Sequence, residues 1–192
     1  NVKKNIPQKS GMGGGSMNAA CLLKFFMKKK IINISKKTAE NISFSIGSDV
    51  VLGLEKKNTI LFKNGKIGRL KNSVNLYVLI AMPNFGCSTT KIYSKIRNFS
   101  KQVYFKSNNQ LFKTTNLIRS NNDLEKIVLN KHSKVKNLKN FLSVLPNVVF
   151  TRMTGSGSAV VAYFKSQKSA KKAAKIFKKK YRSYWYIVSK TI

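Results

Sequence analysis

The sequence predicts an α+β fold, a sandwich in which helices lie to one side of a sheet. A glycine-rich loop joins a strand-like segment to an apolar helix within residues 2–29, an Asn-Gly pair at residues 64–65 separates two short strands, and the last third alternates helices with strands. This mixture of elements is typical of α+β architectures. With 192 residues, 42% of them hydrophobic, the chain is long enough to bury a core in one or two domains.

The first segment of the chain is expected to be a strand, at residues 2–6. Residues 18–29 are predicted to form a helix, whose final lysines suit the negative end of the helix dipole. A second helix is predicted at residues 35–46, with Ser35 or Thr38 as its N-cap because a hydroxyl can accept a hydrogen bond from a free backbone N–H of the first turn.

The middle of the chain contains the clearest hairpin signal. Residues 50–54 are apolar, and residues 59–62 are expected to pair with residues 66–70, because Asn-Gly favours a tight two-residue turn. Residues 75–82 form a continuous apolar run that predicts a buried strand. Residues 88–96 follow as a helix, with Ser88 or Thr89 as its cap.

The last third is predicted to alternate helices and strands around a turn of small residues at 155–158. That turn, between two strands, is either a plain tight hairpin or part of a binding site. The expected helices are residues 123–130, 136–145 and the basic 168–179, and the expected strands are residues 148–151, 159–164 and 184–188.

The formal charge of +33 arises from 38 Lys and Arg against 5 Asp and Glu. The basic residues are spread along the chain, which fits a general compositional bias as well as a selected surface. The charge therefore favours any phosphate-bearing ligand and is weak evidence for nucleic acid.

Cys21 and Cys87 have neither metal-site nor disulfide-framework spacing, so a reducing cytoplasm is expected. No stretch is long and apolar enough to predict a membrane span, and no signal peptide opens the chain.

The glycine loop within residues 7–20 is the most informative motif. Glycine lets the backbone approach a ligand closely, and a helix that begins at such a loop offers free N–H groups and a positive dipole end, so the loop is expected to hold phosphate. Its pattern is neither the Walker motif nor the dinucleotide fingerprint. The alternative is a flexible Gly/Ser tether, against which stand the apolar segments on both sides.

Acidic residues are so scarce that each can be considered singly. Asp49 stands apart, because it lies in a tight Gly-Ser-Asp turn between apolar segments. It is a candidate general base, and the alternative is a turn residue that ends a helix. The single histidine, His132, lies in a polar stretch and is expected to be solvated.

Five motifs in order resemble those of the GHMP kinases. Residues 7–20 match the family's phosphate loop, Pro-x-x-x-Gly-Leu-Gly-Gly-Gly-Ser-Ser-Asn/Asp-Ala-Ala, with Met12 for Leu and Met17 for the second Ser. Residues 47–50 match Gly-Ser/Ala-Asp-Val, with Val51 where the family has Pro. Residues 83–93 resemble Pro-Gly-x-x-x-x-Thr-x-x-x-Tyr/Phe, and Asn122-Asp-Leu-Glu and Met153-Thr-Gly-Ser-Gly-Ser-Ala follow in the family's order.

The resemblance implies an ATP-dependent small-molecule kinase of non-mevalonate isoprenoid (terpenoid) biosynthesis, which phosphorylates the 2-hydroxyl of 4-diphosphocytidyl-2-C-methyl-D-erythritol. Asp49 would be the catalytic base. Mg²⁺ is expected from the reaction class and would be held mainly by ATP, because no carboxylate cluster is present to bind it. The phosphate loop would bind ATP through Pro7, Gly11, Met12, Gly13, Gly14, Gly15, Ser16 and Met17, and the substrate would contact Thr89, Tyr93, Gly155, Ser156 and Gly157. For Tyr93, a place in the core is a nearly equal alternative.

The resemblance also implies the domain organisation. Residues 1–70 would be the remainder of an N-terminal, ribosomal S5-like ATP-binding domain, and residues 71–192 a ferredoxin-like C-terminal domain. The family's opening strand, with its lysine motif, has no match here, so an N-terminal segment is expected to be missing. Oligomeric state is left open.

Three other functions stay open at this point. The chain could be a stand-alone pseudoenzyme, or a GHMP kinase acting on mevalonate, homoserine or a sugar. It could also be a basic, non-enzymatic nucleic-acid-binding protein. Residues 184–186 (Tyr-Trp-Tyr) are the best aromatic cluster for that role, and the favoured alternative is that they lie in the core or at the edge of a strand.

Overall fold

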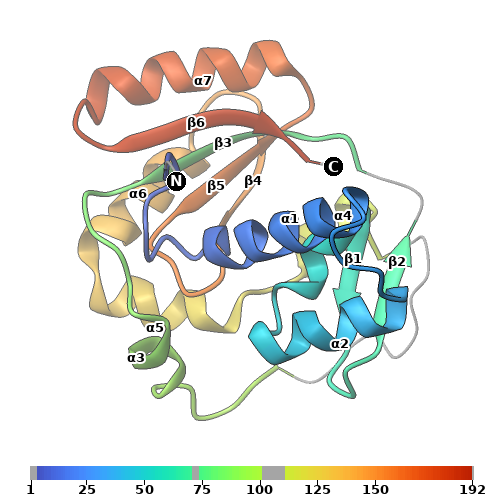
Figure 1. Ribbon diagram of the computed structural model, residues 1–192. Helices are drawn as coiled ribbons and strands as arrows, with labels where there is room; N and C mark the ends of the chain where they lie inside the picture. Colours follow the sequence, from blue (N-terminus) through green and yellow to red (C-terminus); the bar gives the residue numbers. More distant parts are fainter. Residues whose placement is uncertain (1–3, 71–73, 101–110, 192) are drawn as a thin grey trace. The chain divides into compact units, whose positions relative to one another are not determined.

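The computed structural model describes residues 4–70, 74–100 and 111–191 (Figure 1). They form two compact units, one made of residues 4–12, 74–100 and 111–191, the other of residues 13–70. Within these ranges no helix combines the length and apolar character that crossing a bilayer requires.

A four-stranded antiparallel sheet is the centre of the first unit. Its strand order is β4-β5-β3-β6, with helices inserted between β3 and β4 and between β5 and β6 (Figure 1). This β-α-β-β-α-β order is ferredoxin-like, which confirms the predicted C-terminal architecture. The strands are β3 (Tyr77–Met82), β4 (Val148–Met153), β5 (Val160–Phe164) and β6 (Trp185–Lys190), and the helices are α3 (Thr89–Tyr93), α4 (Thr114–Arg119), α5 (Asp123–Lys131), α6 (Ser133–Ser143) and α7 (Gln167–Lys180).

The core of this unit lies between the sheet and its long helices. Leu79 of β3 and Phe164 of β5 are fully buried in one cluster with Leu138 and Leu142 of α6 and Phe177 of α7. Full burial of one such side chain stabilises the fold by about 1.5–3 kcal/mol. The alternation of side chains along each strand brings these residues to one face of the sheet.

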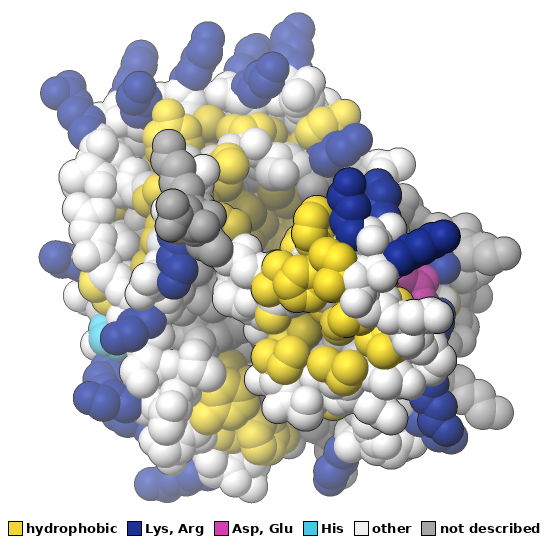
Figure 2. Space-filling view, in the orientation of Figure 1, with side chains coloured by type: hydrophobic (Ala, Val, Ile, Leu, Met, Phe, Trp, Pro, Cys, Tyr) yellow, Lys and Arg dark blue, Asp and Glu magenta, His cyan; other side chains and the backbone are white. Residues whose placement is uncertain are grey.

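Helix α7 is strongly amphipathic. Its alanines and Phe177 are buried against the sheet, whereas its lysines are all exposed. Figure 2 shows the dark blue basic side chains that project along this helix at the top of the view. The exposed residues are Lys168, Lys171, Lys172, Lys175, Lys178, Lys179 and Lys180. This pattern is that of a surface helix with one apolar stripe.

The second unit contains two helices, one short 3₁₀ helix and a hairpin. The hairpin confirms the prediction from Asn-Gly: Leu61 pairs with Ile67 and Asn58 with Leu70. Its elements are α1 (Gly14–Lys28), α2 (Lys36–Ile46), η1 (Val51–Leu54), β1 (Asn58–Leu61) and β2 (Ile67–Leu70). Ser35 is the N-cap of α2 and accepts a hydrogen bond from Thr38 N at 3.0 Å, so of the two predicted caps Ser35 is correct.

Several predicted boundaries are wrong. Helix α1 begins at Gly14 rather than residue 18, because the first N–H groups of a helix need no partner within it and glycine is tolerated there. Helix α3 is shorter than predicted, and α4 was not predicted. Of the strand expected at residues 2–6, residues 4–6 are not in a strand and the rest lies outside the described ranges.

Candidate active site

Two glycine-containing segments of the first unit lie in backbone contact, although they are far apart in sequence. Gly11 has φ +74°, and a Cβ there would lie 2.2 Å from the carbonyl oxygen of Thr154 and 2.7 Å from the nitrogen of Gly157. In the opposite direction, a Cβ on Gly155 would lie 2.8 Å from the carbonyl oxygen of Gly11. Only glycine fits at either position, so the phosphate loop and the turn of small residues pack directly against each other.

Hydrogen bonds fix this contact. The carbonyl oxygen of Ser10 accepts from Ala159 N at 3.1 Å and from Thr154 Oγ1 at 3.0 Å. The preceding carbonyl, that of Lys9, accepts from Cys87 N at 2.9 Å. Ser158, predicted only as a member of the turn of small residues, donates from Oγ to the carbonyl of Phe85. The three motifs around residues 7–11, 83–89 and 154–158 therefore meet in one unit.

The predicted substrate residues belong to the same cluster. Thr89 Oγ1 and Ser156 Oγ are 2.9 Å apart and share a hydrogen bond. Tyr93 lies one turn after Thr89 on α3 and is 51% exposed, whereas its neighbour Ile92 is buried. Ile92 therefore anchors α3 in the core, and the alternative of Tyr93 as a core aromatic is wrong.

The other half of the phosphate loop belongs to the second unit. Gly13, with φ +63°, is the N-cap of α1, and no side chain caps that helix. The first intrahelical bond runs from Met17 N to the carbonyl oxygen of Gly13 at 2.9 Å. The N–H groups of Gly14, Gly15 and Ser16 thus have no partner within the helix, and they coincide with the positive end of its dipole. This arrangement suits an anion.

Met17 replaces a serine of the family pattern, and the structure explains its packing. A Cβ on Gly53 of η1 would lie 2.9 Å from Met17 Sδ and 2.7 Å from Ala20 Cβ, so α1 and η1 are in close contact there. The methionine contributes to this packing, while the backbone donors of the loop remain in place.

Asp49 also belongs to the second unit, in the turn between α2 and η1. It is exposed, and no hydrogen bond or ion pair to any described residue engages its carboxylate. The next two residues, Val50 and Val51, are fully buried, and Val50 N donates to the carbonyl of Gly47 at 3.0 Å. The turn is thus anchored on one side of Asp49, and its carboxylate is free to engage a ligand.

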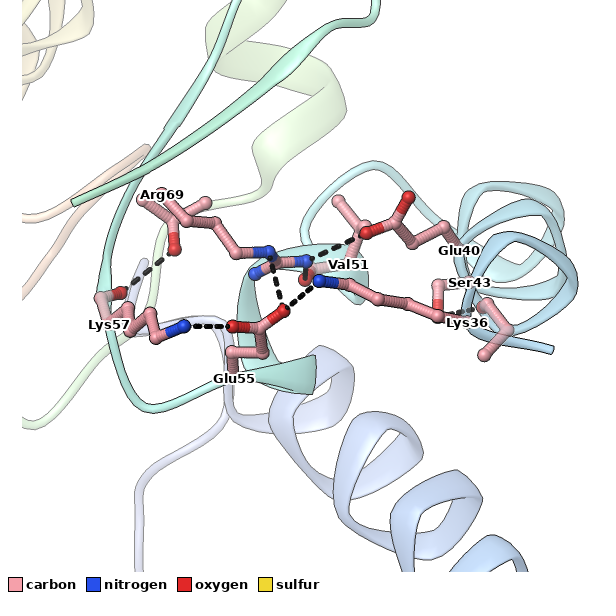
Figure 3. Close-up of polar contacts among 9 residues, drawn as sticks. Lys36, Glu40, Ser43, Val51, Glu55, Lys57 and Arg69 are labelled. Carbon is pink, nitrogen blue, oxygen red and sulfur yellow. Dashed lines mark hydrogen bonds and ion pairs between the residues drawn. The ribbon is translucent and has the colours of Figure 1, made fainter. Parts of the chain in front are cut away.

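A cluster of charges holds the segment that follows Asp49. Glu55 pairs with Lys36 at 2.6 Å, with Lys57 at 2.8 Å and with Arg69 at 3.2 Å (Figure 3). Arg69 also donates to the carbonyl oxygen of Val51 at 3.3 Å. Hydrogen bonds from Lys36 and Lys57, together with the Arg69 charge, lower the pKa of Glu55 to about 2. Val51, which replaces the family's proline, is therefore fixed by burial and by Arg69.

The remaining acids have structural partners. Glu40 pairs with Arg69 at 3.3 Å, and Asp123 accepts from Ser100 N at 2.9 Å. Glu125 accepts from Met153 N at 2.7 Å and pairs with Lys139. Asp49 is consequently the one acid, among the parts of the chain that the structure describes, whose carboxylate has no structural use.

The single histidine and the Tyr-Trp-Tyr cluster are both partly buried. His132 packs against Phe85 with ring centroids 5.2 Å apart, and burial, with the charges of Lys131 and Lys95, lowers its pKa, so the expectation of a simply solvated histidine is wrong. In the Tyr-Trp-Tyr cluster, Tyr186 contacts Phe177 with ring centroids 5.5 Å apart. Its ring packs against α7, which does not favour a base-stacking platform.

No group of three or more His, Cys, Asp or Glu side chains that could hold a metal ion occurs in residues 4–70, 74–100 and 111–191. The described side chains therefore do not fit a magnesium site built from protein ligands alone.

Comparisons with known proteins agree with the motifs. The model of the GHMP kinase N-terminal domain matches residues 1–56, and the model of the GHMP kinase C-terminal region matches residues 106–183. The chain is 51% identical over 191 residues to the 4-diphosphocytidyl-2-C-methyl-D-erythritol kinase of Pelagibacter ubique, covering 100% of this chain and 68% of that protein. It is 33% identical over 199 residues to the kinase of the same name from Clostridium perfringens, covering 100% of this chain and 69% of that protein.

A solved structure shares the fold. The crystal structure of a 4-(cytidine 5'-diphospho)-2C-methyl-D-erythritol kinase superposes with a TM-score of 0.78 at 19% identity, covering 98% of this chain and 68% of that one. The chain therefore spans about two thirds of the length of the proteins it resembles.

Proposed function

We propose, on the premise that this chain belongs to the GHMP kinase family, that it transfers the γ-phosphoryl group of ATP to the 2-hydroxyl of 4-diphosphocytidyl-2-C-methyl-D-erythritol. The chain is a small-molecule kinase that uses ATP. The observation that carries the choice of substrate is the 51% identity, along 100% of this chain, to a kinase named for that substrate.

The phosphate loop binds ATP in this proposal. Backbone N–H groups from Gly11 to Ser16 face the phosphate oxygens, with the N-terminus of α1 adding its dipole. Phosphoryl transfer depends mainly on position and on stabilising charge, so fixed backbone donors supply much of what the reaction needs. The absence of a side-chain cap on α1 supports this role, because a capping side chain would compete for the same donors.

Asp49 is proposed as the general base. Its carboxylate accepts the proton of the substrate hydroxyl as the oxygen attacks the γ-phosphorus and the bond to the bridging oxygen of ADP breaks. The other four acids are held in ion pairs or hydrogen bonds, and Asp49 is exposed with no partner among the described residues. Support for this role also comes from its position in the family's Gly-Ser/Ala-Asp-Val motif.

Thr89 and Tyr93 are proposed to bind the cytidine end of the substrate. Both are exposed on α3, four positions apart, and so lie on one face of the helix. In this proposal the hydroxyl of Thr89 binds the polar edge of the base, and the ring of Tyr93 stacks on the face of the base. Gly155, Ser156 and Gly157 present backbone beside the phosphates, where side chains larger than these would not fit.

Magnesium is proposed to arrive with ATP. The described residues offer no carboxylate cluster to hold it, and Mg²⁺ in phosphoryl-transfer sites is commonly bound through substrate phosphates with few protein ligands. Its chemistry when bound is to neutralise phosphate charge.

The proposal is tested by an assay of ATP-dependent phosphorylation, followed by ³¹P NMR, with the whole polypeptide that carries these 192 residues. The acceptor alcohols are 4-diphosphocytidyl-2-C-methyl-D-erythritol, mevalonate, homoserine and galactose. We expect the highest kcat/KM for the first, with the new phosphate on the 2-hydroxyl. A higher kcat/KM for another alcohol would replace the substrate and keep the enzyme class. Folded protein that phosphorylates none of them would contradict the proposal.

A further inference from the structure

The turn between β4 and β5 is held by a side chain from outside it. Asn122 Nδ2 donates to the carbonyl oxygen of Gly155 at 2.8 Å and to that of Met153 at 3.0 Å. The other end of the same amide, Oδ1, accepts from Leu124 N at 3.0 Å and so caps helix α5. One side chain therefore performs two tasks, which need an acceptor and two donors together.

This combination restricts the residue type. Both turn partners are carbonyl oxygens, so the group that faces them has to donate, while the helix N-terminus requires an acceptor. Aspartate and serine cap helices as well as asparagine does, but aspartate has no donor and serine is too short to reach both carbonyls. An asparagine at position 122 is thus explained by the turn, and the cap alone does not require it.

The carbonyl that Asn122 holds belongs to the residue in contact with the phosphate loop. Gly155 has φ +40°, and it lies so close to the Gly11 carbonyl that an added Cβ would be 2.8 Å from that oxygen. Gly157 N donates to the Thr154 carbonyl at 2.7 Å, which closes the turn. Small displacements of Gly155 would therefore alter the spacing between the two backbones.

A second bond from the same helix acts on the same segment. Glu125 Oε2 accepts from Met153 N at 2.7 Å, so the N-terminal turn of α5 holds residue 153 at its N–H and, through Asn122, at its carbonyl. The turn is thereby tied to α5 at two peptide groups before it reaches Gly11.

We infer that Asn122 is a positioning residue for ATP binding: its amide holds Gly155 against Gly11 and so fixes the backbone surface that faces the phosphates. The inference rests on the proposed function of that loop and turn. Asn122 itself touches neither substrate. Misplacement of a binding group by about 1 Å can cost about 100-fold in rate, so loosening the turn should be visible in kinetics.

The test compares three variants of the whole polypeptide. Asn122→Ser and Asn122→Asp keep an N-cap on α5 and remove the amide nitrogen that donates to both turn carbonyls. Ser166→Ala is the matched control, because Ser166 caps α7 by accepting from Ser169 N at 3.1 Å and lies outside the turn. The readouts are amide hydrogen exchange at Gly157, ATP affinity by calorimetry, and the KM for ATP against kcat.

We expect both Asn122 variants to speed exchange at Gly157 and to weaken ATP binding, with KM for ATP raised about tenfold or more. Ser166→Ala should lower Tm and leave the KM for ATP unchanged. Normal ATP affinity in a folded Asn122→Ser would overturn the inference, whether or not exchange at Gly157 changes. A third outcome is that the Asn122 variants bind ATP more weakly than the wild type, while the wild type phosphorylates none of the acceptors. That result would support the inference and contradict the proposed function. Wild-type protein that binds no ATP would contradict both.

Discussion

Thr89 Oγ1 lies 2.9 Å from Ser156 Oγ, although 67 positions separate the two residues in the chain. The motifs that contain these two residues can bind one substrate together only if they are close in the folded chain. This hydrogen bond shows that they are. The same unit places Gly11 against Gly155. The residues proposed to bind the acceptor and part of the phosphate loop thus form a continuous cluster.

Gly11→Ala is predicted to disrupt the phosphate loop. The left-handed φ costs alanine about 1–2 kcal/mol, and the new Cβ would also lie 2.2 Å from a backbone oxygen that cannot move freely. Thermal unfolding should show a marked fall in Tm, with loss of ATP binding. Gly13→Ala is the control, because it has φ +63° but no atom within 4 Å of the added Cβ. Equal falls in Tm in the two variants would mean that the contact with Thr154 adds nothing to stability.

Gly15→Ala is predicted to separate stability from ATP binding. Gly15 lies in the first turn of α1, and an added Cβ meets nothing within 4 Å. Alanine favours the helix by up to about 1 kcal/mol, so Tm should be unchanged or raised. The methyl group would occupy the space proposed for phosphate, so the KM for ATP should rise. An unchanged KM would argue against phosphate binding at this turn.

Tyr93→Ala is predicted to weaken binding of the cytidyl substrate with little loss of stability. Its side chain is 51% exposed, and surface substitutions usually change the free energy of unfolding by about 0.5 kcal/mol or less. Stacking on a base contributes about 1–3 kcal/mol, so the KM for the acceptor should rise about 5- to 150-fold. Ile92→Ala provides the contrast, because Ile92 is buried and its truncation should cost about 2–5 kcal/mol of stability.

Acid is predicted to destabilise the second unit through Glu55. Its pKa is about 2 in the folded chain against an ordinary value of 4.5, so the folded state binds fewer protons than the unfolded state between these values. The stabilisation is therefore complete above pH 4.5 and is lost as pH falls toward 2. Urea unfolding at several pH values should show that the free energy of unfolding falls as the pH falls from 4.5 toward 2. Glu55→Gln should reduce this dependence on pH. An equal slope in the variant would assign the acid sensitivity to other groups.

Much of the first unit could be predicted, because its signals are local. Continuous apolar runs mark its strands, and the amphipathic pattern of residues 168–179 marks α7. Contacts between residues that are far apart in the sequence could not be predicted from such local signals. The ion pairs of Arg69 with Glu40 and Glu55 depend on how the hairpin packs on α2 and η1, which no sequence period encodes.

The candidate site was also predicted only in part: its local motifs were found, and its contacts between residues far apart in the sequence were not. The glycine loop, Asp49, Thr89 and Tyr93 were predicted from motifs, and their roles stay predictions. The bonds of Asn122 were not predicted, because an asparagine directly before a helix is explained by capping alone. Nothing local indicates that its other amide end reaches residues 153 and 155. Helix α4 was missed because its six residues contain no buried side chain and so no amphipathic pattern.

Asp49 is proposed as the base of an ATP-dependent kinase, and turnover of Asp49→Asn tests this role most directly. Asparagine keeps the size of the side chain and removes the proton acceptor, so kcat should fall by about 10²- to 10⁴-fold while calorimetry shows unchanged ATP binding. Asp123→Asn is the matched control: Asp123 is held by Ser100, and its loss should affect stability with kcat preserved. A kcat in Asp49→Asn equal to that of the wild type would contradict the role of Asp49 as the base.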